Sequence, residues 1–126
     1  MSPGNPADRV GPEGVGGARP WLAGRLTAAG MQIALVERKH PGGTCVNTGC
    51  IPTKTLVASV RAVNVARSAA DYCVMIGAAV QVDMERVRAR KDRVALASRD
   101  GVTSWLEGMD GLALIRGHAR LTVRSN

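Results

Sequence analysis

The sequence predicts an α/β fold in which long helices pack against a parallel sheet. Three observations support this class. The apolar run "MQIALVE" reads as a buried strand that ends at an acidic residue, and "GLALIR", much later in the chain, reads as a second strand. Between them, two long stretches repeat their apolar residues at helical spacing. Strands that alternate with long helices are typical of a parallel sheet.

The composition is that of a globular chain long enough for one domain. Of the 126 residues, 45% are hydrophobic and 21% are charged, and 15 are glycine. Phenylalanine is absent, so aliphatic side chains must build the core and we expect marginal stability. The net charge of +7 would attract nucleic acid, acidic lipid or a phosphate-rich cofactor, and the charge alone does not choose among these partners.

The sequence also bears on the cellular compartment. No segment has the pattern of a secretory signal, and no run of about 18 apolar residues occurs. We therefore expect a cytoplasmic protein that does not associate with membranes. In a reducing compartment, a disulfide is catalytic or redox-sensing more often than it is structural.

The first 30 residues divide into a loop and a short helix. Residues 1–17 are crowded with Gly and Pro, so we expect them to be disordered or loop-like and residues 18–126 to form the folded domain. Two leucines four positions apart indicate a helix over residues 21–29, and Gly30 stands where a helix stop belongs. The first strand of the predicted sheet follows directly.

Two long helices are predicted after that strand. The first begins close to Cys50, and the second runs from Asp83, which can cap it, to about Met109. Residues 72–82 lean towards β structure and predict one or two short strands, in which Cys73 packs as a small hydrophobic residue. The apolar stripe of the first helix comprises Leu56, Val60, Val63, Ala66 and Ala70.

The last predicted elements are two short strands. Residues 111–123 read as a strand, a turn around Gly117 and His118, and another strand. The arginine-rich stretch "RVRARKDR" belongs to the second long helix, whose apolar stripe is already accounted for. Because the aromatic residues that stack on single-stranded nucleic acid are absent, we expect this stretch to be a solvated face and predict no nucleic-acid partner.

Two of the three cysteines lie together in "HPGGTCVNTGCIPTKTL". Cys50 would lie at a helix amino terminus, where unpaired N–H groups stabilise a thiolate, and Pro52 suits the first turn of that helix. Gly49 permits the bend that brings Cys50 back to Cys45. Lys54 lies about one turn further along the same face. The residues therefore predict a redox dithiol with a neighbouring cation.

Other interpretations of the cysteine pair stay open on the residues alone. A zinc pair is disfavoured, because a gap of four residues is unusual and no second Cys or His pair lies nearby, so we predict no metal site. Two unrelated buried cysteines would fit the same pattern. A flavin-free thiol module, which acts as a redox sensor or binds a soft metal, is also open.

The segment "GGTCVNTGCIPTKTL" resembles, nearly residue for residue, the redox-active disulfide segment of the class I pyridine nucleotide-disulfide oxidoreductases. These flavoenzymes include mercuric reductase, dihydrolipoamide dehydrogenase and glutathione reductase. The resemblance implies that Cys45 exchanges with the substrate, that Cys50 is the charge-transfer thiolate against FAD, and that Lys54 lies near the flavin. It also implies that the α/β fold is part of a Rossmann-like FAD-binding domain.

The resemblance extends over about residues 22–121 and implies a set of contacts with FAD. Glu37, at the end of the first strand, would bind the adenosine ribose, as an acidic residue does in dinucleotide folds. His118 and Ala119 match a segment whose backbone contacts adenine. The other cofactor residues that the resemblance implies are Gly14, Gly16, Arg38, Gly43, Thr44 and Lys54.

The sequence departs from this family near its start. The glycine fingerprint of the phosphate-binding turn would fall on residues 14–19, where Arg19 replaces the third glycine. Pro12 and Glu13 lie where the central first strand should be, and neither residue suits a buried parallel strand. We therefore expect this strand to be missing or damaged, which puts FAD binding in question.

The reaction that the resemblance implies passes electrons from NAD(P)H through FAD to the Cys45–Cys50 disulfide, and then to a disulfide or a metal ion such as mercuric ion. Family members are homodimers with NAD(P) and dimerisation domains, for which the sequence has no counterpart. We expect a fragment that is not active alone, in which neither His40 nor His118 replaces the family's catalytic base. The alternative is an inert, truncated remnant.

Overall fold

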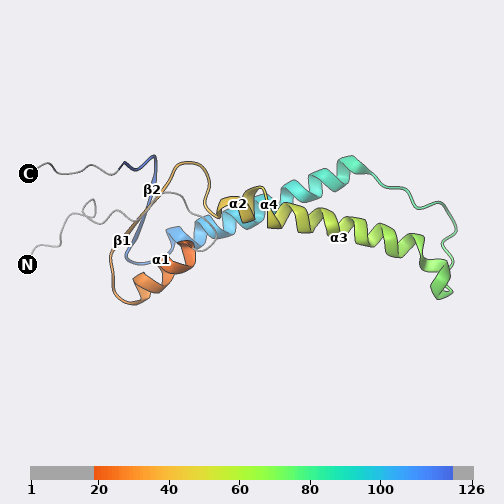
Figure 1. The fold of residues 1–126 in the computed structure, drawn as a ribbon, viewed down its shortest axis with the longest axis horizontal. Coiled ribbons are helices and arrows are strands. Elements are labelled where there is room, and N and C mark those ends of the chain that lie inside the picture. Colours follow the sequence, from red (N-terminus) through yellow and green to blue (C-terminus); the bar gives the residue numbers. More distant parts are fainter. Residues whose placement is uncertain (1–18, 121–126) are drawn as a thin grey trace, which may run out of the picture.

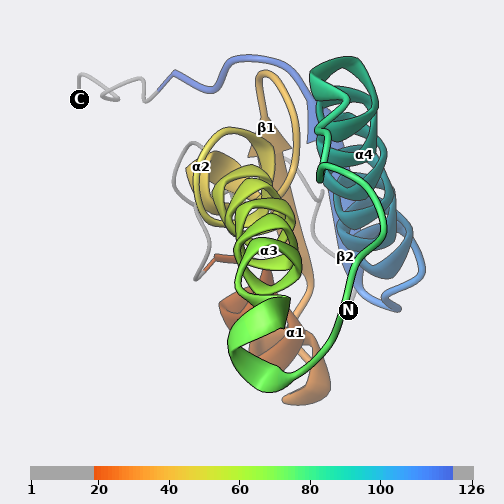
Figure 2. The ribbon, with the colours of Figure 1, turned by 90° about the vertical axis from the view of Figure 1, so that its right-hand side faces the viewer.

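The computed structural model describes residues 19–120 and confirms the α/β class (Figure 1). A small sheet lies at one end of the molecule, and a hairpin of two long helices extends away from it. Seen along the hairpin, the two helices lie side by side (Figure 2). The elements are α1 (Arg19–Ala28), β1 (Ile33–Glu37), α2 (Gly43–Asn47), α3 (Cys50–Arg67), the 3₁₀ turn η2 (Ala69–Tyr72), α4 (Met84–Glu107) and β2 (Leu112–Arg116).

The sheet consists of β1 and β2, which pair in parallel as the sequence predicted. In its register Leu35 lies opposite Leu114, and Glu37 lies opposite Arg116. The helices α2, α3 and α4 form the connection between the two strands. The predicted damage to an earlier strand, and the predicted loop over residues 1–17, fall outside the described residues.

The core lies between the sheet and the last turns of α4. Leu106 is fully buried and packs with Leu35 of β1 at the centre of the cluster. The partly buried residues packed around this pair are Val102, Met109, Leu112 and Leu114. The side chains of this cluster are aliphatic, as the absence of phenylalanine predicted.

Helix α1 packs beside this core and ends close to the predicted position. Trp21 and Trp105 of α4 lie with their ring centroids 4.9 Å apart. Ala23 is buried, whereas Leu22, one of the two predicted leucines, is exposed. Gly30 follows the helix with φ of 79°, a left-handed conformation that a side chain disfavours.

The packed face of α3 differs from the predicted stripe in its first half, and Ala70, the last residue of that stripe, is exposed and lies in η2. Thr55 is buried and Ser59 is half-buried, whereas Leu56 is 38% exposed and Val60 is 67% exposed. Arg90 of α4 explains the offset, because its Nη1 donates to the backbone oxygen of Thr55 at 2.9 Å and to Ser59 Oγ at 3.3 Å. The prediction that Leu56 and Val60 face the core is therefore wrong.

The tip of the hairpin also differs from the prediction. Residues 73–83 form no strand, and Cys73 is exposed with φ of 61° instead of packing in an apolar run. A β-leaning sequence needs a neighbouring strand to pair with, and the nearest described strands lie at the other end of the molecule (Figure 1). The predicted cap at Asp83 is confirmed, since its Oδ1 accepts from the N–H of Arg86 at 3.0 Å.

The chain after β2 is partly described. Gly117 donates its N–H to the backbone oxygen of Glu37 at 3.0 Å, and residues 117–120 contain no strand. The remainder of the predicted final strand falls outside the described residues. Between residues 19 and 120, no helix is both long and apolar enough to cross a membrane.

Candidate functional site

The turn that carries the two cysteines is built from glycines at both ends. Gly42 precedes α2 with φ of 96°, and a Cβ on it would lie 2.7 Å from the Val46 side chain. Gly49 precedes α3 and donates its N–H to the backbone oxygen of Thr44 at 2.6 Å. A Cβ at Gly49 would lie 2.9 Å from that same oxygen. Glycine is therefore favoured at position 49 because the folded-back turn leaves no room there for a side chain.

The two thiols lie next to each other in this turn. Cys50 is the first residue of α3 and is exposed, while Cys45 on α2 is half-buried, and both are free thiols. The pKa of Cys45 lies above its ordinary value, first because its thiol hydrogen-bonds to Cys50, and then because of burial and the charge of Cys50. The ammonium of Lys54 acts in the opposite direction. On balance, the surroundings of Cys45 favour the protonated form of its thiol.

Asn47 fixes the orientation of α2, and the sequence reasoning missed it. Its Nδ2 donates to the backbone oxygens of Pro41 at 3.0 Å and Gly43 at 2.8 Å. Its Oδ1 accepts from Nε of Arg99, on α4, at 2.7 Å. The amide's place between the two cysteines was a signal that could have been used, whereas nothing local to Arg99 indicates this contact.

A second feature lies where both strands end. A hollow of about 260 Å³ is lined by Val36, Glu37, Arg38, Lys39, Gly117, His118 and Ala119. The Glu37 side chain is buried, and its Oε1 accepts from the N–H of Lys39 at 2.7 Å. The carboxyl ends of parallel strands are the usual place for a ligand in open α/β sheets. Four residues that the sequence assigned to adenosine or its neighbourhood thus meet in one hollow.

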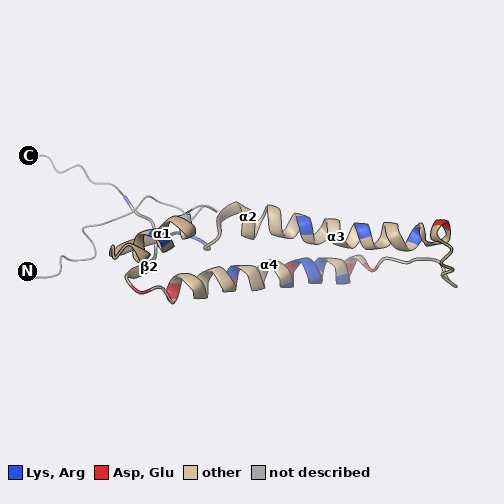
Figure 3. Cartoon of the chain, turned by 90° about the horizontal axis from the view of Figure 1, so that it is seen from below, with Lys and Arg blue, Asp and Glu red and all other residues tan. Residues whose placement is uncertain are grey.

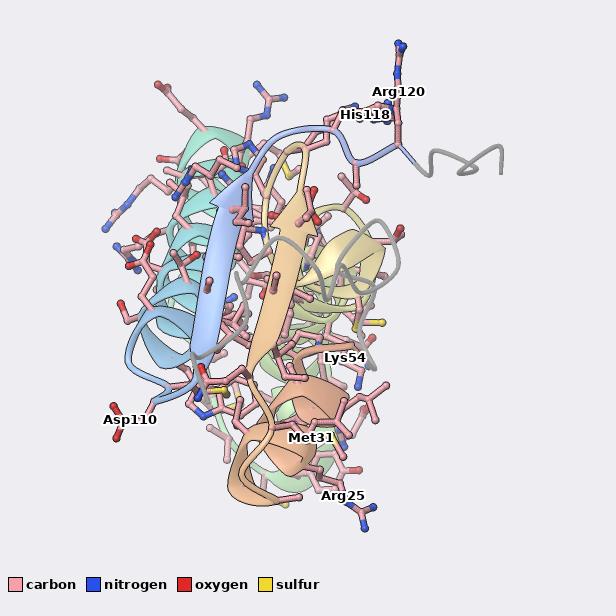
Figure 4. The ribbon with its side chains drawn as sticks, turned by 90° about the vertical axis from the view of Figure 1, so that its left-hand side faces the viewer. Arg25, Met31, Lys54, Asp110, His118 and Arg120 are labelled. Atoms are coloured by element: carbon pink, nitrogen blue, oxygen red, sulfur yellow. The ribbon has the colours of Figure 1, made fainter. Side chains whose placement is uncertain are left out.

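The side-chain view separates the two features (Figure 4). His118 and Arg120 lie beyond the arrowheads of both strands, and Met31 and Asp110 lie at the opposite end of the sheet. Lys54 lies to one side of the sheet, apart from His118. Gly43 begins α2 and Thr44 follows it, so both belong to the cysteine turn and not to the hollow. Gly14 and Gly16 fall outside the described residues.

Two further observations concern ligands. Among residues 19–120, no group of three or more His, Cys, Asp or Glu side chains is placed to hold a metal ion. A hollow of about 410 Å³ lies at the hairpin tip, and alanine and valine side chains supply most of its lining. The tip hollow presents little polar chemistry compared with the hollow at the strand ends.

Comparison with known proteins gives the following matches. No family model matches the chain. It is 36% identical over 95 residues to a dihydrolipoyl dehydrogenase of Acholeplasma laidlawii, a match that covers 74% of this chain and 28% of that protein. It is 35% identical over 98 residues to a dihydrolipoyl dehydrogenase of Rhizobium etli, covering 78% of this chain and 20% of that protein.

A solved structure matches as well. The HOCl-induced flavoprotein disulfide reductase of Escherichia coli superposes with a TM-score of 0.68 and 32% sequence identity, over 86% of this chain and 21% of that protein. The same reductase has also been solved as a Cu(II) complex. This chain therefore spans roughly a fifth to three tenths of the length of the proteins that it matches.

Proposed function

The chain is related to the class I pyridine nucleotide-disulfide oxidoreductases, and from this premise we propose that it carries the FAD-adenosine site and the redox dithiol of such a flavoprotein. The observation that supports the proposal most is the hollow at the strand ends, which gathers Glu37, Arg38, His118 and Ala119 from two segments about 80 residues apart in sequence. The division of the chain into a loop-like start and a domain from residue 18 is part of the same proposal.

The hollow fits the adenosine part of FAD in its chemistry. A carboxylate at the end of a parallel strand accepts hydrogen bonds from ribose hydroxyls, and the Glu37 carboxylate lines the hollow and is held by the N–H of Lys39. His118 and Ala119 also line the hollow, and we propose that their backbone faces the base. The positive side chains of Arg38 and Lys39 beside the hollow favour a ligand that carries phosphates.

The dithiol turn lies apart from the hollow, and the separation suits an extended dinucleotide. One end of such a ligand would occupy the hollow and the other would approach Cys50, with Gly43, Thr44 and Lys54 along the way or near its end. When bound, FAD would accept hydride from NAD(P)H and pass the electron pair to the disulfide. We propose that Lys54 places its positive charge where negative charge develops during this transfer.

The dithiol itself performs a reversible two-electron step. When Cys45 and Cys50 form the sulfur–sulfur bond, two protons and two electrons leave for the acceptor, and reduction reverses this. The raised pKa of Cys45 and the position of Cys50 at the start of α3 support different roles for the two sulfurs, because a helix amino terminus favours a thiolate. We propose that Cys50 faces the flavin and that Cys45, once deprotonated, attacks the acceptor.

For the acceptor we propose a small-molecule disulfide. Mercuric ion is the second candidate, and the likeness around residues 51–63 to mercuric reductases supports it. A soft metal ion prefers several thiolates. Cys73, the third cysteine, lies at the hairpin tip, so the described chain offers one thiol pair. We also propose a cytoplasmic location. For a full-length protein of this family, we propose a homodimer.

A second candidate is a chain that binds no flavin and associates with another protein surface. The exposed apolar residues along α3 favour this candidate, since Val57, Val60 and Val65 are each more than half exposed. Such a chain could be a flavin-free thiol module that acts as a redox sensor or binds a soft metal, or an inert, truncated remnant. It predicts that the purified chain retains no flavin.

The deciding experiment is FAD binding by the purified chain. We expect the chain to retain FAD after gel filtration and to develop a long-wavelength band when one equivalent of dithiol reductant is added, and we expect Cys50→Ser to lose that band. Glu37→Gln should weaken FAD binding about tenfold or more, because a carboxylate hydrogen bond is lost. A chain without bound flavin would contradict the proposal and favour the second candidate.

The matched control for Glu37→Gln is Asp110→Asn. Asp110 is an exposed carboxylate at the opposite end of the sheet (Figure 4), so its neutralisation changes the net charge equally without touching the hollow. We expect Asp110→Asn to leave the FAD dissociation constant within about twofold. Equal losses in the two variants would mean that only the net charge matters and that the hollow does not bind adenosine.

A further inference from the structure

We propose that Arg99 is a positioning residue for the dithiol, which acts through Asn47 to hold α2 in the orientation that lets Cys45 and Cys50 join. This inference rests on the proposed redox role of the two cysteines. It concerns a residue of α4 that lies 52 positions after Asn47 in the sequence and outside the cysteine motif.

The hydrogen bond between Arg99 and Asn47 joins a long helix, α4, to a short one, α2. Helix α4 has 24 residues and carries the buried Leu106 of the core, whereas α2 has five residues and none of them is buried. A helix of five residues does not hold its own position in water, because helix nucleation is unfavourable and few hydrogen bonds follow it. The orientation of α2 must therefore come from its contacts with other elements.

The Asn47 side chain makes such contacts through both atoms of its amide group, Nδ2 and Oδ1. Nδ2 donates to the oxygens of Pro41 and Gly43, which ties the last residue of α2 to the loop before it and to its first residue. Oδ1 accepts from the Arg99 guanidinium at 2.7 Å, within the short range of charge-assisted bonds. With all three bonds made, α2 has one orientation relative to α4.

This orientation matters because a disulfide has a narrow geometry. The Cα atoms must come within about 4.4–6.8 Å, and the sulfurs must meet at a dihedral angle near ±90°. Cys45 is on α2 and Cys50 is on α3, so a rotation of α2 moves one sulfur and not the other. Loosening α2 should therefore lower the effective concentration of one thiol for the other and disfavour the disulfide.

The test measures the equilibrium of the dithiol with glutathione. One protein dithiol and one oxidised glutathione give one protein disulfide and two reduced glutathiones, so two protons and two electrons pass to glutathione. The chain with Cys73→Ser, which leaves a single pair, is equilibrated in glutathione buffers, quenched with acid and alkylated. The mass of the intact chain then gives the oxidised fraction.

We expect both single variants to disfavour the disulfide, and Asn47→Ala at least as strongly as Arg99→Gln, because it also removes the two bonds of Nδ2. Arg99→Gln and Asn47→Ala should each lower the oxidation constant about tenfold, which is about 30 mV in the midpoint potential. The double variant should be no worse than Asn47→Ala alone, because Arg99 acts on the dithiol through Asn47. Arg99→Lys keeps a charged donor and should recover part of the loss.

Arg90→Gln is the matched control. Arg90 is also an arginine of α4 that bonds across to another helix, but its partners are Thr55 and Ser59 of α3 and not α2. We expect its oxidation constant to stay within twofold of the parent chain. Circular dichroism checks the helices, and Asn47→Ala, whose site lies outside the core, decides the matter if Arg99→Gln unfolds.

Three outcomes would overturn the proposal. Oxidation constants for Arg99→Gln and Asn47→Ala within twofold of the parent would show that the contact does not position the dithiol. Equal losses in Arg99→Gln and Arg90→Gln would assign the effect to helix pairing in general. A parent chain that forms no Cys45–Cys50 disulfide would overturn the proposed redox function itself, and the role of Arg99 with it.

Discussion

The two ends of the α3–α4 hairpin are made differently. At the sheet end, Thr55, Ala95 and Leu106 are buried, and arginines of α4 bond to α2 and α3. At the tip, Tyr72 is 78% exposed and Met75 is 87% exposed. Lysines and arginines lie along both helices of the hairpin (Figure 3), so charge does not distinguish the ends. The ends differ instead in their buried residues and their long-range hydrogen bonds.

This difference indicates which end of the hairpin is stabilised by contacts within the chain. The long-range side-chain hydrogen bonds named above lie where the cysteines are, and they tie α2 and α3 to the helix that packs on the sheet. The apolar residues of the tip lie against water, where they contribute little to the free energy of folding. The sheet end therefore contributes most of the free energy of folding, whereas the tip leaves apolar side chains exposed.

The largest effect we expect comes from truncating the core at the sheet end. Leu106→Ala should reduce the free energy of unfolding by about 2–5 kcal/mol, because it leaves a cavity beside Leu35. Met75→Ala, at the tip, should change it by less than about 0.5 kcal/mol. Urea denaturation followed by circular dichroism measures both. Comparable losses at the two positions would erase the contrast between the ends.

A smaller effect is expected from adding one methyl group to the cysteine turn. Gly49→Ala should cost about 1–3 kcal/mol, because the new Cβ would meet the Thr44 oxygen at 2.9 Å. Gly77→Ala, at the tip, should cost nothing measurable, since no atom lies within 4 Å of the added group. Thermal unfolding of the two variants compares them. A tolerated Gly49→Ala would show that the turn adapts freely.

The smallest effect concerns proton binding within the turn. Removing the Cys50 side chain in Cys50→Ala should lower the pKa of Cys45, because both the hydrogen bond and the charge that raise it disappear. Lys54→Met should raise that pKa further, since the positive charge opposes the shift. Cys45 reacts as its thiolate, so its alkylation should begin at lower pH in the first variant and at higher pH in the second.

The two variants can be compared with an internal reference. Cys73 lies at the tip, remote from the turn, and its alkylation profile should be the same in all three chains. Peptide mapping after timed alkylation separates the two sites. Shifts of the same sign for Cys45 in Cys50→Ala and Lys54→Met would contradict the roles assigned to the hydrogen bond and the ammonium.

Local patterns predicted most of the elements. The stop at Gly30, the cap at Asp83 and the existence of the two strands follow from residues within a few positions of each other. The cysteine turn was likewise predictable, because glycines on both sides and a following helix are set by adjacent residues. Capping, turn geometry and periodicity depend on neighbours in sequence, so the sequence alone determines them.

Only the tertiary structure decided which faces are covered and what holds the turn. The packed stripe of α3 runs through Thr55 and Ser59 because Arg90 reaches them from α4, 31 to 35 residues away. The bond from Arg99 to Asn47 spans 52 residues, and residues 73–83 lack the neighbour that a strand requires. A hydrogen bond between distant residues depends on how whole helices are placed, and no local pattern in the sequence encodes that placement.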